Sequence, residues 1–236
     1  MRFAGVAAIS LDLDDTLWPF QPAVERAEAT LHAWLVKHAP GTARILPARG
    51  MLGKLRNDYE HSRPDLAGNY RALRIGSIEL ALALAGEDMG LAEEAYGVFY
   101  SARQKVEFFE DVWPALTWLS ARFPLVALTN GNADLRLTGG GAFFRETLSA
   151  RAVGIAKPQA GIFHAAALAA GVPASELLHV GDDFHLDYLG ALNAGLQAAW
   201  LVRDHPKETA PGEYARYVTI RDLTALCCAL GGPANL

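Results

Sequence analysis

The sequence predicts an α/β fold, a doubly wound parallel sheet with an all-helical segment inserted into it. Three observations predict this class: short apolar runs that end in small or polar residues, helix-periodic segments between those runs, and one long stretch with helical patterns only. Short apolar runs bounded by polar clusters are typical of buried strands, and strands alternating with helices form parallel sheets. The apolar runs are Val6–Leu11, Leu125–Leu128, Leu177–Val180 and Ala198–Val202.

Composition and charge narrow the classes of function. The chain of 236 residues is 51% hydrophobic and 20% charged, which is typical of a soluble globular protein with enough apolar side chain for a core. Its formal net charge of −5 and its lack of a dense basic run argue against nucleic acid as a main partner. The two cysteines, Cys227 and Cys228, are adjacent and indicate neither a disulfide framework nor a zinc site.

The sequence gives no sign of a membrane partner. Its apolar stretches are shorter than a membrane span; Leu80–Ala85, for example, is bounded by Glu79 and Gly86. The N-terminus begins a strand pattern and lacks the features of a signal peptide. We therefore expect a cytoplasmic protein, and the sequence leaves its oligomeric state open.

The first apolar run ends in an acidic sequence, DLDDTL, at residues 12–17. In open α/β sheets, ligands bind at the carboxyl ends of the strands. Residues two apart on an extended backbone point the same way, so Asp12 and Asp14 would lie together, and their repulsion favours a nearby cation. One interpretation is therefore a metal-assisted pair of acids. The other is a solvated turn, because Asp caps helices and tolerates tight loops.

The stretch between residues 19 and 108 differs from the rest because it carries helical patterns and no convincing strand. Its helix-like segments are Pro22–Lys37, Gly50–His61, Tyr70–Ala85 and Leu91–Val106, punctuated at Pro40-Gly41, Arg63-Pro64-Asp65 and Gly86-Glu87-Asp88. We expect an α/β core domain over residues 1–18 and 109–236 and a helical cap domain over residues 19–108. A block inserted at this point would cover the carboxyl end of the first strand.

Three further helical patterns follow in the core. Trp113–Phe123 has a proline suited to a first turn, and Gln159–Ala170 and Tyr188–Ala194 stop at the glycines that follow them. The glycines at 139–141 are expected to form a flexible loop rather than a phosphate cradle, since no strand directly precedes them.

Four polar motifs occur along the core part of the sequence. They are Asp12–Thr16, Thr129–Asn132, Lys157-Pro158 and Gly181–Asp187. Together they resemble the motifs of the haloacid dehalogenase-type (HAD) hydrolases that carry a helical cap after the first strand. The resemblance covers essentially the whole core and implies a Rossmann-like sheet.

The resemblance implies phosphoryl-transfer chemistry at the first strand. Asp12 would be the nucleophile that forms an aspartyl-phosphate, and Asp14 would protonate the leaving alcohol and then take a proton from water. Mg²⁺ suits a site of a few carboxylates plus a substrate phosphate. Asp12 and Asp182 would supply carboxylates to the metal, and Asp14 its backbone carbonyl.

The same resemblance implies groups that bind the phosphate. The Leu13 and Asp14 amides would face it, and Thr129 would donate its hydroxyl, with Asn130 and Gly131 alongside. A Thr-Asn pair after a strand is also commonly just a turn.

The third and fourth motifs supply the remaining charges. Lys157 would neutralise phosphate charge and hold Asp12; a lone lysine is usually solvated, but the proline that follows disfavours helix at Lys157 and favours a fixed loop position. Asp187 would act behind the metal ligands by orienting Lys157 or a metal-bound water. Asp183 is placed with it, although its side chain could simply cap the next helix.

Other polar and aromatic residues near the motifs receive structural interpretations. Asp15, where many members of the family have glycine, is assigned a structural or supporting part, His179 a core position and His185 a possible helix cap. Trp18 is interpreted as part of a hydrophobic hinge, with a stacking surface for a ring-bearing substrate as the alternative.

Two cap arginines, Arg71 and Arg74, lie three apart on one helical face. We interpret them as part of a solvated face, with a second anion-binding site as the alternative.

Asp14 favours phosphate chemistry among the reactions of the family. An alkoxide leaving group needs a proton and a halide does not, and dehalogenases typically carry an aromatic residue at this position. We therefore predict a phosphatase of small phosphorylated metabolites, with phosphomutase, dehalogenase and a non-catalytic binding protein as alternatives. Phe109–Leu116, Leu128–Asn132 and Ala156–Pro158 resemble the YigB-like phosphatases, which implies FMN or a related ribityl or sugar phosphate as substrate.

Overall fold

The computed structural model describes residues 3–47, 50–66, 68–203 and 218–233. The chain divides into two compact units, one formed by Met1–Pro19 with Phe108–Leu236 and the other by Phe20–Glu107. Each junction differs by one residue from the expected domain boundary. The second unit is therefore inserted into the first directly after the acidic segment that follows the first strand.

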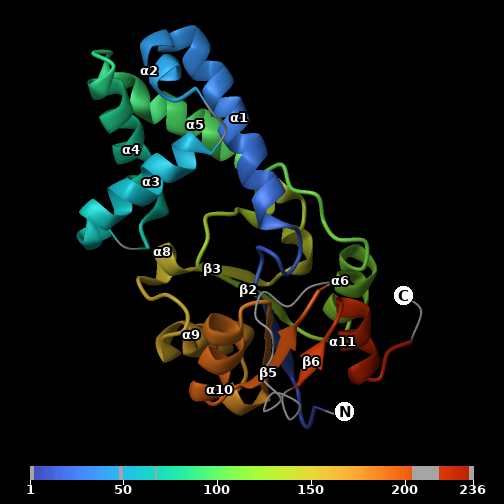
Figure 1. Cartoon of the computed structure of the whole chain (residues 1–236). Helices are drawn as coiled ribbons and strands as arrows, with labels where there is room; N and C mark the ends of the chain where they lie inside the picture. The colour runs from blue at the N-terminus through green and yellow to red at the C-terminus, as the bar shows by residue number, and fades with distance from the viewer. Residues whose placement is uncertain (1–2, 48–49, 67, 204–217, 234–236) are drawn as a thin grey trace. The chain divides into compact units, whose positions relative to one another are not determined.

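The first unit is built on a six-stranded parallel sheet with the strand order β3-β2-β1-β4-β5-β6 (Figure 1). The strands are β1 (Ala8–Leu11), β2 (Leu125–Thr129), β3 (Glu146–Ser149), β4 (Leu177–Gly181), β5 (Gln197–Leu201) and β6 (Thr219–Ile220). The parallel α/β class and the four expected strands are confirmed. The sequence analysis missed β3 and β6, which lie at the two edges of the sheet, because β3 is half-exposed and mixed in character and β6 has two residues.

Helices cover both faces of this sheet. α9 (Ala160–Ala170) and α10 (Gly190–Asn193) lie on one face, and α6 (Val112–Ser120) and α11 (Leu223–Ala229) on the other (Figure 1). The strands β1, β2 and β4 are buried along their whole length, as expected for strands covered on both sides. Shorter elements complete the unit: α7 (Leu135–Thr138), η3 (Gly141–Phe143), α8 (Ala150–Val153), η4 (Ala174–Glu176) and η5 (Phe184–Leu189).

Two expectations for this unit need correction. The segment expected as one helix over Tyr188–Ala194 begins earlier, as the π-helical η5, and continues into α10. The glycines at 139–141 are not simply a loop, because Gly139 ends α7 in a left-handed conformation with φ 95° and Gly141 opens η3.

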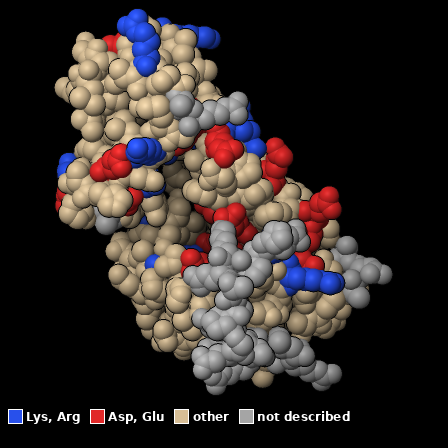
Figure 2. All heavy atoms as spheres, in the orientation of Figure 1, with Lys and Arg blue, Asp and Glu red and all other residues tan. Residues whose placement is uncertain are grey.

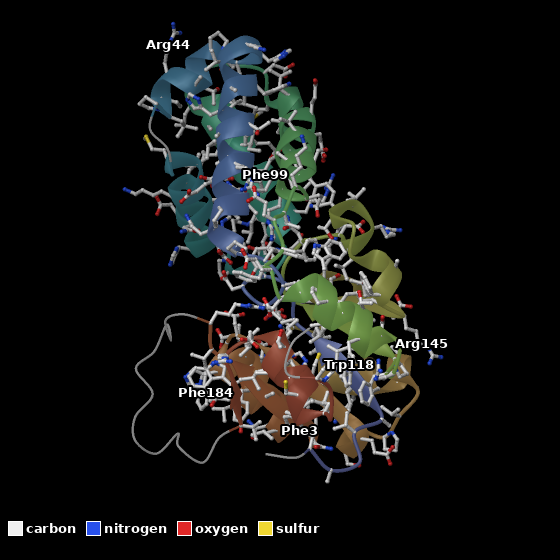
Figure 3. All side chains as sticks on the ribbon, turned by 90° about the vertical axis from the view of Figure 1, so that its right-hand side faces the viewer. Phe3, Arg44, Phe99, Trp118, Arg145 and Phe184 are labelled. Atoms are coloured by element: carbon white, nitrogen blue, oxygen red, sulfur yellow. The ribbon has the colours of Figure 1, made fainter. Side chains whose placement is uncertain are left out.

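The second unit is helical throughout its described residues. Its elements are α1 (Phe20–His38), α2 (Pro40–Ile45), α3 (Met51–Ser62), η1 (Pro64–Leu66), α4 (Tyr70–Leu84), η2 (Met89–Leu91) and α5 (Ala92–Arg103). Leu31, Leu82 and Phe99 belong to its buried core, and Figure 3 shows Phe99 among the helices. The expected break at Pro40-Gly41 is wrong in part: Pro40 opens α2, a position that suits proline because its missing N–H is not needed there.

The two cap arginines do not share a solvated face. Arg74 is buried: its Nη1 lies 3.3 Å from Glu28 Oε1, and its guanidinium lies 4.3 Å from the Phe99 ring centroid. Arg71 is more exposed and pairs with Glu93 at 2.6 Å. The solvated interpretation is therefore wrong for Arg74, whose charge is paired with Glu28 inside the helical unit.

Charged side chains of both signs lie on the face of the molecule in Figure 2. On the face in Figure 2, the described basic side chains are interspersed with acidic ones and form no continuous basic area. Among the described residues, no helix is both long and apolar enough to cross a bilayer.

Arg203 fixes the two places where the chain leaves and re-enters the first unit. Its Nη1 and Nη2 donate to the two Asp111 carboxylate oxygens at 2.8 and 3.0 Å, and Nη2 also donates to the Thr16 carbonyl at 2.9 Å. The guanidinium lies 4.0 Å from the Phe109 ring centroid, and the Phe109 N–H donates to the Leu17 carbonyl. One side chain therefore ties the segment after β1 to the segment before α6.

We expect Arg203→Leu to lower the free energy of unfolding by about 2 kcal/mol, because a largely buried bidentate ion pair and the bond to Thr16 are lost. Urea unfolding followed by circular dichroism measures the change. The control is Arg136→Leu, which removes an 86% exposed side chain paired with Asp134 and should cost less than about 0.5 kcal/mol. Equal losses in the two variants would contradict the assigned role of Arg203.

Candidate active site

The carboxyl edge of the sheet brings the sequence motifs together. β1 ends directly before Asp12, β2 ends at Thr129, and β4 ends at Gly181, directly before Asp182. Because β2, β1 and β4 are adjacent and parallel, their carboxyl ends lie at the same edge of the sheet. Lys157, in the turn before α9, reaches this edge from another part of the chain.

A buried lysine between two carboxylates forms the centre of the site. Lys157 Nζ donates to Asp12 Oδ1 and to Asp187 Oδ1, each at 2.5 Å. Lys157, Asp12 and Asp187 are all buried. Buried charges are stable only when they are paired and hydrogen-bonded, so this trio is a fixed arrangement rather than a set of solvated surface groups.

The environment shifts the pKa values of Asp12 and Asp187 in opposite directions. Burial raises the pKa of Asp12 well above its ordinary value, although the charge of Lys157 acts in the opposite direction. Burial also acts to raise the pKa of Asp187, but the Lys157 charge and the His179 hydrogen bond outweigh it and hold that pKa below its usual range. Burial would lower the pKa of Lys157, but the two carboxylates keep it above its ordinary value. Asp187 is therefore the carboxylate that balances the charge of Lys157 in the protein as it stands. Asp12 is the carboxylate that a second cation would stabilise.

Asn130 fixes the backbone of Lys157. Its Nδ2 donates to the Lys157 carbonyl at 3.0 Å, and the Lys157 N–H donates to Asn130 Oδ1 at 2.9 Å. The nitrogen and the oxygen of the Asn130 side-chain amide are thus both bonded to the backbone of Lys157. The expectation that Asn130 accompanies Thr129 as a phosphate ligand needs correction, because its geometry is that of a support for the lysine.

Thr129 and Gly131 form a small hydroxyl-bearing turn at the end of β2. Thr129 is buried, and its Oγ1 accepts a hydrogen bond from the Gly131 N–H at 2.9 Å. Because the hydroxyl oxygen is already an acceptor here, its own proton can be donated to another group.

A second buried chain of hydrogen bonds supports Asp187 from inside the sheet. Ser10 and His179 are register partners on β1 and β4, and Ser10 Oγ lies 2.8 Å from His179 Nδ1. His179 Nε2 lies 3.0 Å from Asp187 Oδ1. Burial lowers the pKa of His179, despite the opposing effect of Asp187, so the ring is neutral, with Nε2–H donating to the carboxylate and Nδ1 accepting from Ser10.

His179 was expected at a core position, and its link to Asp187 was not predicted. The spacing along the strands could have indicated it. Ser10 lies two residues before Asp12, and His179 two before Gly181, and residues two apart on a strand point to the same face of the sheet.

The loop after β4 is shaped around the Asp187 carboxyl group. A β-carbon at Gly181 would collide with that group, so glycine is needed there for space. The Asp183 N–H donates to Asp187 Oδ2 at 3.1 Å, and Asp183 Oδ1 accepts from the backbone N–H groups of His185 and Leu186 at 2.8 Å each. The helix-capping alternative for Asp183 therefore describes its side chain.

Three carboxylates at this edge can offer oxygens to one cation. Oxygens of Asp12, Asp182 and Asp187 all lie within 4.8 Å of one another, and an all-oxygen set suits a hard ion such as Mg²⁺. The Asp187 oxygens already accept hydrogen bonds from Lys157, His179 and the Asp183 amide. Asp12 and Asp182 are therefore the better-placed ligands of the three.

The acidic segment after β1 folds into a tight turn. The Asp15 N–H donates to the Trp18 carbonyl at 2.7 Å, and the Leu17 N–H to the Leu13 carbonyl at 2.7 Å. Asp15 has φ 58°, a left-handed conformation that Gly, Asn and Asp adopt most readily. Asp15 thus has a backbone role, as expected.

The same turn places Trp18 against Asp14. Trp18 Nε1 donates to Asp14 Oδ1 at 2.8 Å, and its ring meets Phe108 edge-to-face at 5.0 Å. The indole is fully buried. The alternative that Trp18 offers a stacking surface to a substrate is therefore not supported.

Comparison with known proteins identifies the arrangement. Residues 6–195 match the family model of the haloacid dehalogenase-like hydrolases. The chain is 32% identical over 203 residues to the 5-amino-6-(5-phospho-D-ribitylamino)uracil phosphatase YigB of Escherichia coli (strain K12), covering 83% of both chains. It is 34% identical over 129 residues, 52% of both chains, to a phosphoserine phosphatase of Thermus thermophilus. A structure of a 2-haloacid dehalogenase from Pseudomonas syringae pv. Tomato DC3000 superposes with a TM-score of 0.83 at 35% identity, covering 96% of this chain and 98% of that one.

We expect Lys157→Met to lower the free energy of unfolding by about 3 kcal/mol or more in EDTA at pH 8, because two buried carboxylates lose their shared cation. Without the lysine, the folded-state pKa of each carboxyl rises above its unfolded value of about 4. The folded variant then binds more protons than the unfolded chain, so the deficit should shrink as the pH falls from 8 to 5.

Urea unfolding at the two pH values measures this effect. Lys54→Met, which removes an exposed lysine on α3, is the matched control and should show no comparable loss. A deficit for Lys157→Met that is small, or that is the same at both pH values, would argue against the buried trio.

Proposed function

The chain belongs to the haloacid dehalogenase-like hydrolase family, and from that premise we propose that it hydrolyses small phosphate monoesters with a magnesium ion and an aspartyl-phosphate intermediate. The observation that carries the proposal is the pair of acids at the end of β1. Asp12 is buried against Lys157, and Asp14, two residues later, is partly exposed and bonded to Trp18. Two acids in different environments suit two different tasks.

In the first step, an Asp12 carboxylate oxygen attacks phosphorus while the bond between phosphorus and the leaving oxygen breaks. Asp14 gives its proton to that oxygen, so the product leaves as a neutral alcohol. In the second step, water attacks the phosphorus, and Asp14 takes the proton of that water. The bond between phosphorus and Asp12 breaks, which releases inorganic phosphate and restores both acids.

Positive charge and hydrogen-bond donors support both steps. Lys157 balances the charge of Asp12 and of the phosphate. Thr129 donates its hydroxyl proton to a phosphate oxygen, and the backbone amides of Leu13 and Asp14 face the same group. Mg²⁺, held by the Asp12 and Asp182 carboxylates and the Asp14 carbonyl, would shield the anionic nucleophile from the anionic phosphate. Asp187, bonded to Lys157, keeps the lysine in place.

The relatives support a proposal for the substrate class. A phosphatase named for a phosphorylated ribitylamino compound shares 32% identity over most of both chains, and we therefore propose FMN or a related ribityl or sugar phosphate. The helical unit, which enters the chain between Pro19 and Phe108, is the part of the protein that we expect to select among such substrates.

Asp12→Asn should lower the hydrolysis of p-nitrophenyl phosphate by about three orders of magnitude or more, because an amide cannot act as the nucleophile. EDTA should abolish wild-type activity, and added Mg²⁺ should restore it. Release of p-nitrophenol, followed in the presence of excess MgCl₂, gives the measurement.

Asp15→Asn serves as the matched control, since asparagine tolerates the left-handed backbone of this position and Asp15 has no assigned chemical step. It should retain most of the activity. An active Asp12→Asn variant would remove Asp12 from the role of nucleophile.

Dehalogenation is the second candidate, because a protein described as a 2-haloacid dehalogenase is similar over nearly the whole chain. A halide leaves without a proton, so that reaction has no use for a supported acid at Asp14. We expect no halide release from 2-chloropropionate above a no-enzyme blank, measured by ion chromatography with and without EDTA. Halide release that survives EDTA and is lost in Asp12→Asn would favour dehalogenase over phosphatase.

A further inference from the structure

The Trp18 indole performs a task that the proposed mechanism leaves unassigned. The left-handed backbone at Asp15 turns the chain so that Trp18 returns beside Asp14, with the Asp15 N–H bonded to the Trp18 carbonyl. A fully buried indole N–H needs an acceptor. That acceptor is one particular oxygen, Asp14 Oδ1, at 2.8 Å.

Gly131 leaves room for the other oxygen of the same carboxyl group. A β-carbon built on Gly131 would lie 2.7 Å from Asp14 Oδ2, closer than real β-carbons approach other heavy atoms. Gly131 does not have a positive φ, so its effect here is the space it leaves for the Asp14 carboxyl group and not its backbone conformation. Its N–H donates to Thr129 Oγ1. The turn after β1 thus supplies a donor to Asp14 Oδ1, and the end of β2 leaves room for Oδ2.

We propose that Trp18 is a positioning residue that makes Asp14 a one-sided acid, with Oδ1 as the permanent acceptor and Oδ2 as the oxygen that carries the proton. In a protonated carboxyl group the carbonyl oxygen is the acceptor and the hydroxyl oxygen is the donor. An N–H directed at Oδ1 therefore assigns the proton to Oδ2. This inference rests on the proposed phosphatase function and specifies its proton transfer.

The proton balance is the same as in the proposed mechanism, with the atom now named. Oδ2 gives its proton to the leaving oxygen as the phosphorus–oxygen bond breaks, and Oδ2 later takes a proton from the attacking water. Without the indole N–H, the carboxyl group loses the donor that distinguishes Oδ1 from Oδ2. Fewer of the bound complexes then present an acid to the leaving group.

Trp18→Phe tests the proposal because it removes the indole N–H and keeps a smaller aromatic ring against Phe108; the buried volume lost with the second ring does not distinguish one leaving group from another. The readout is kcat/KM, which covers the steps through departure of the leaving group. We expect a drop of about 10- to 100-fold for an alkyl phosphate such as propyl phosphate, part of the 10²- to 10⁴-fold that a general acid supplies. For p-nitrophenyl phosphate, whose leaving group needs little protonation, the drop should be less than about 3-fold.

A second variant approaches Asp14 from the opposite side. Gly131→Ala places a methyl group against Oδ2 and should show the same dependence on the leaving group. Trp113→Phe is the matched control: Trp113 is 42% exposed and its ring lies 4.5 Å from that of Phe108, so it belongs to the same aromatic group. It should leave both kcat/KM values within about 2-fold of wild type.

The outcomes separate the inference from the function on which it rests. If wild-type protein hydrolyses neither ester with Mg²⁺ present, the proposed function fails. If wild type hydrolyses both, and folded Trp18→Phe and Gly131→Ala each lower the two kcat/KM values by the same factor, the assignment of the proton to Oδ2 is overturned. If Trp18→Phe does not fold, the ratio in Gly131→Ala decides.

Discussion

The buried pairing of Lys157 with Asp12 and Asp187 is the interaction on which the rest of the site depends. Three charges removed from water are stable only if each has a partner in a fixed place. The protein meets this condition from two directions. Asn130 holds the backbone of Lys157, and His179 donates to Asp187 from inside the sheet. The edge of the sheet therefore presents Asp12 in one orientation before any ligand binds, which is the preorganisation that phosphoryl transfer requires.

The two acids at the end of β1 differ because their neighbours differ. Asp12 faces a cation and is buried, whereas Asp14 faces an indole N–H and is partly exposed. A carboxylate that a lysine and a metal ion together can stabilise is suited to attack as an anion, whereas a carboxyl group bonded to a neutral donor can take and release a proton. A spacing of two residues would by itself make the pair equivalent. The left-handed turn at Asp15 breaks that equivalence by returning Trp18 to Asp14 alone.

Features that depend on local pattern could be predicted from the sequence, and features that depend on distant contacts could not. Buried apolar runs located the four inner strands, and the motifs at their ends located the edge where the polar residues meet. Strand β3 was missed because a half-exposed edge strand has no apolar run. The partner of Asn130 lies 27 residues away, and the buried state of Arg74 depends on Glu28, 46 residues away. Neither pairing leaves a trace in residue spacing.

Overall likeness cannot separate phosphatase from dehalogenase in this fold, because the parts that produce the likeness serve both reactions. The sheet, Asp12 and Lys157 provide a held carboxylate nucleophile, and such a nucleophile can attack carbon or phosphorus. The reactions differ in what leaves: a halide departs as an anion, whereas an alkoxide requires a proton. That requirement falls on Asp14, which has Trp18 Nε1 bonded to one oxygen and the space left by Gly131 beside the other. An indole N–H directed at one oxygen of Asp14 serves a reaction that needs an acid and is of no use to one that does not.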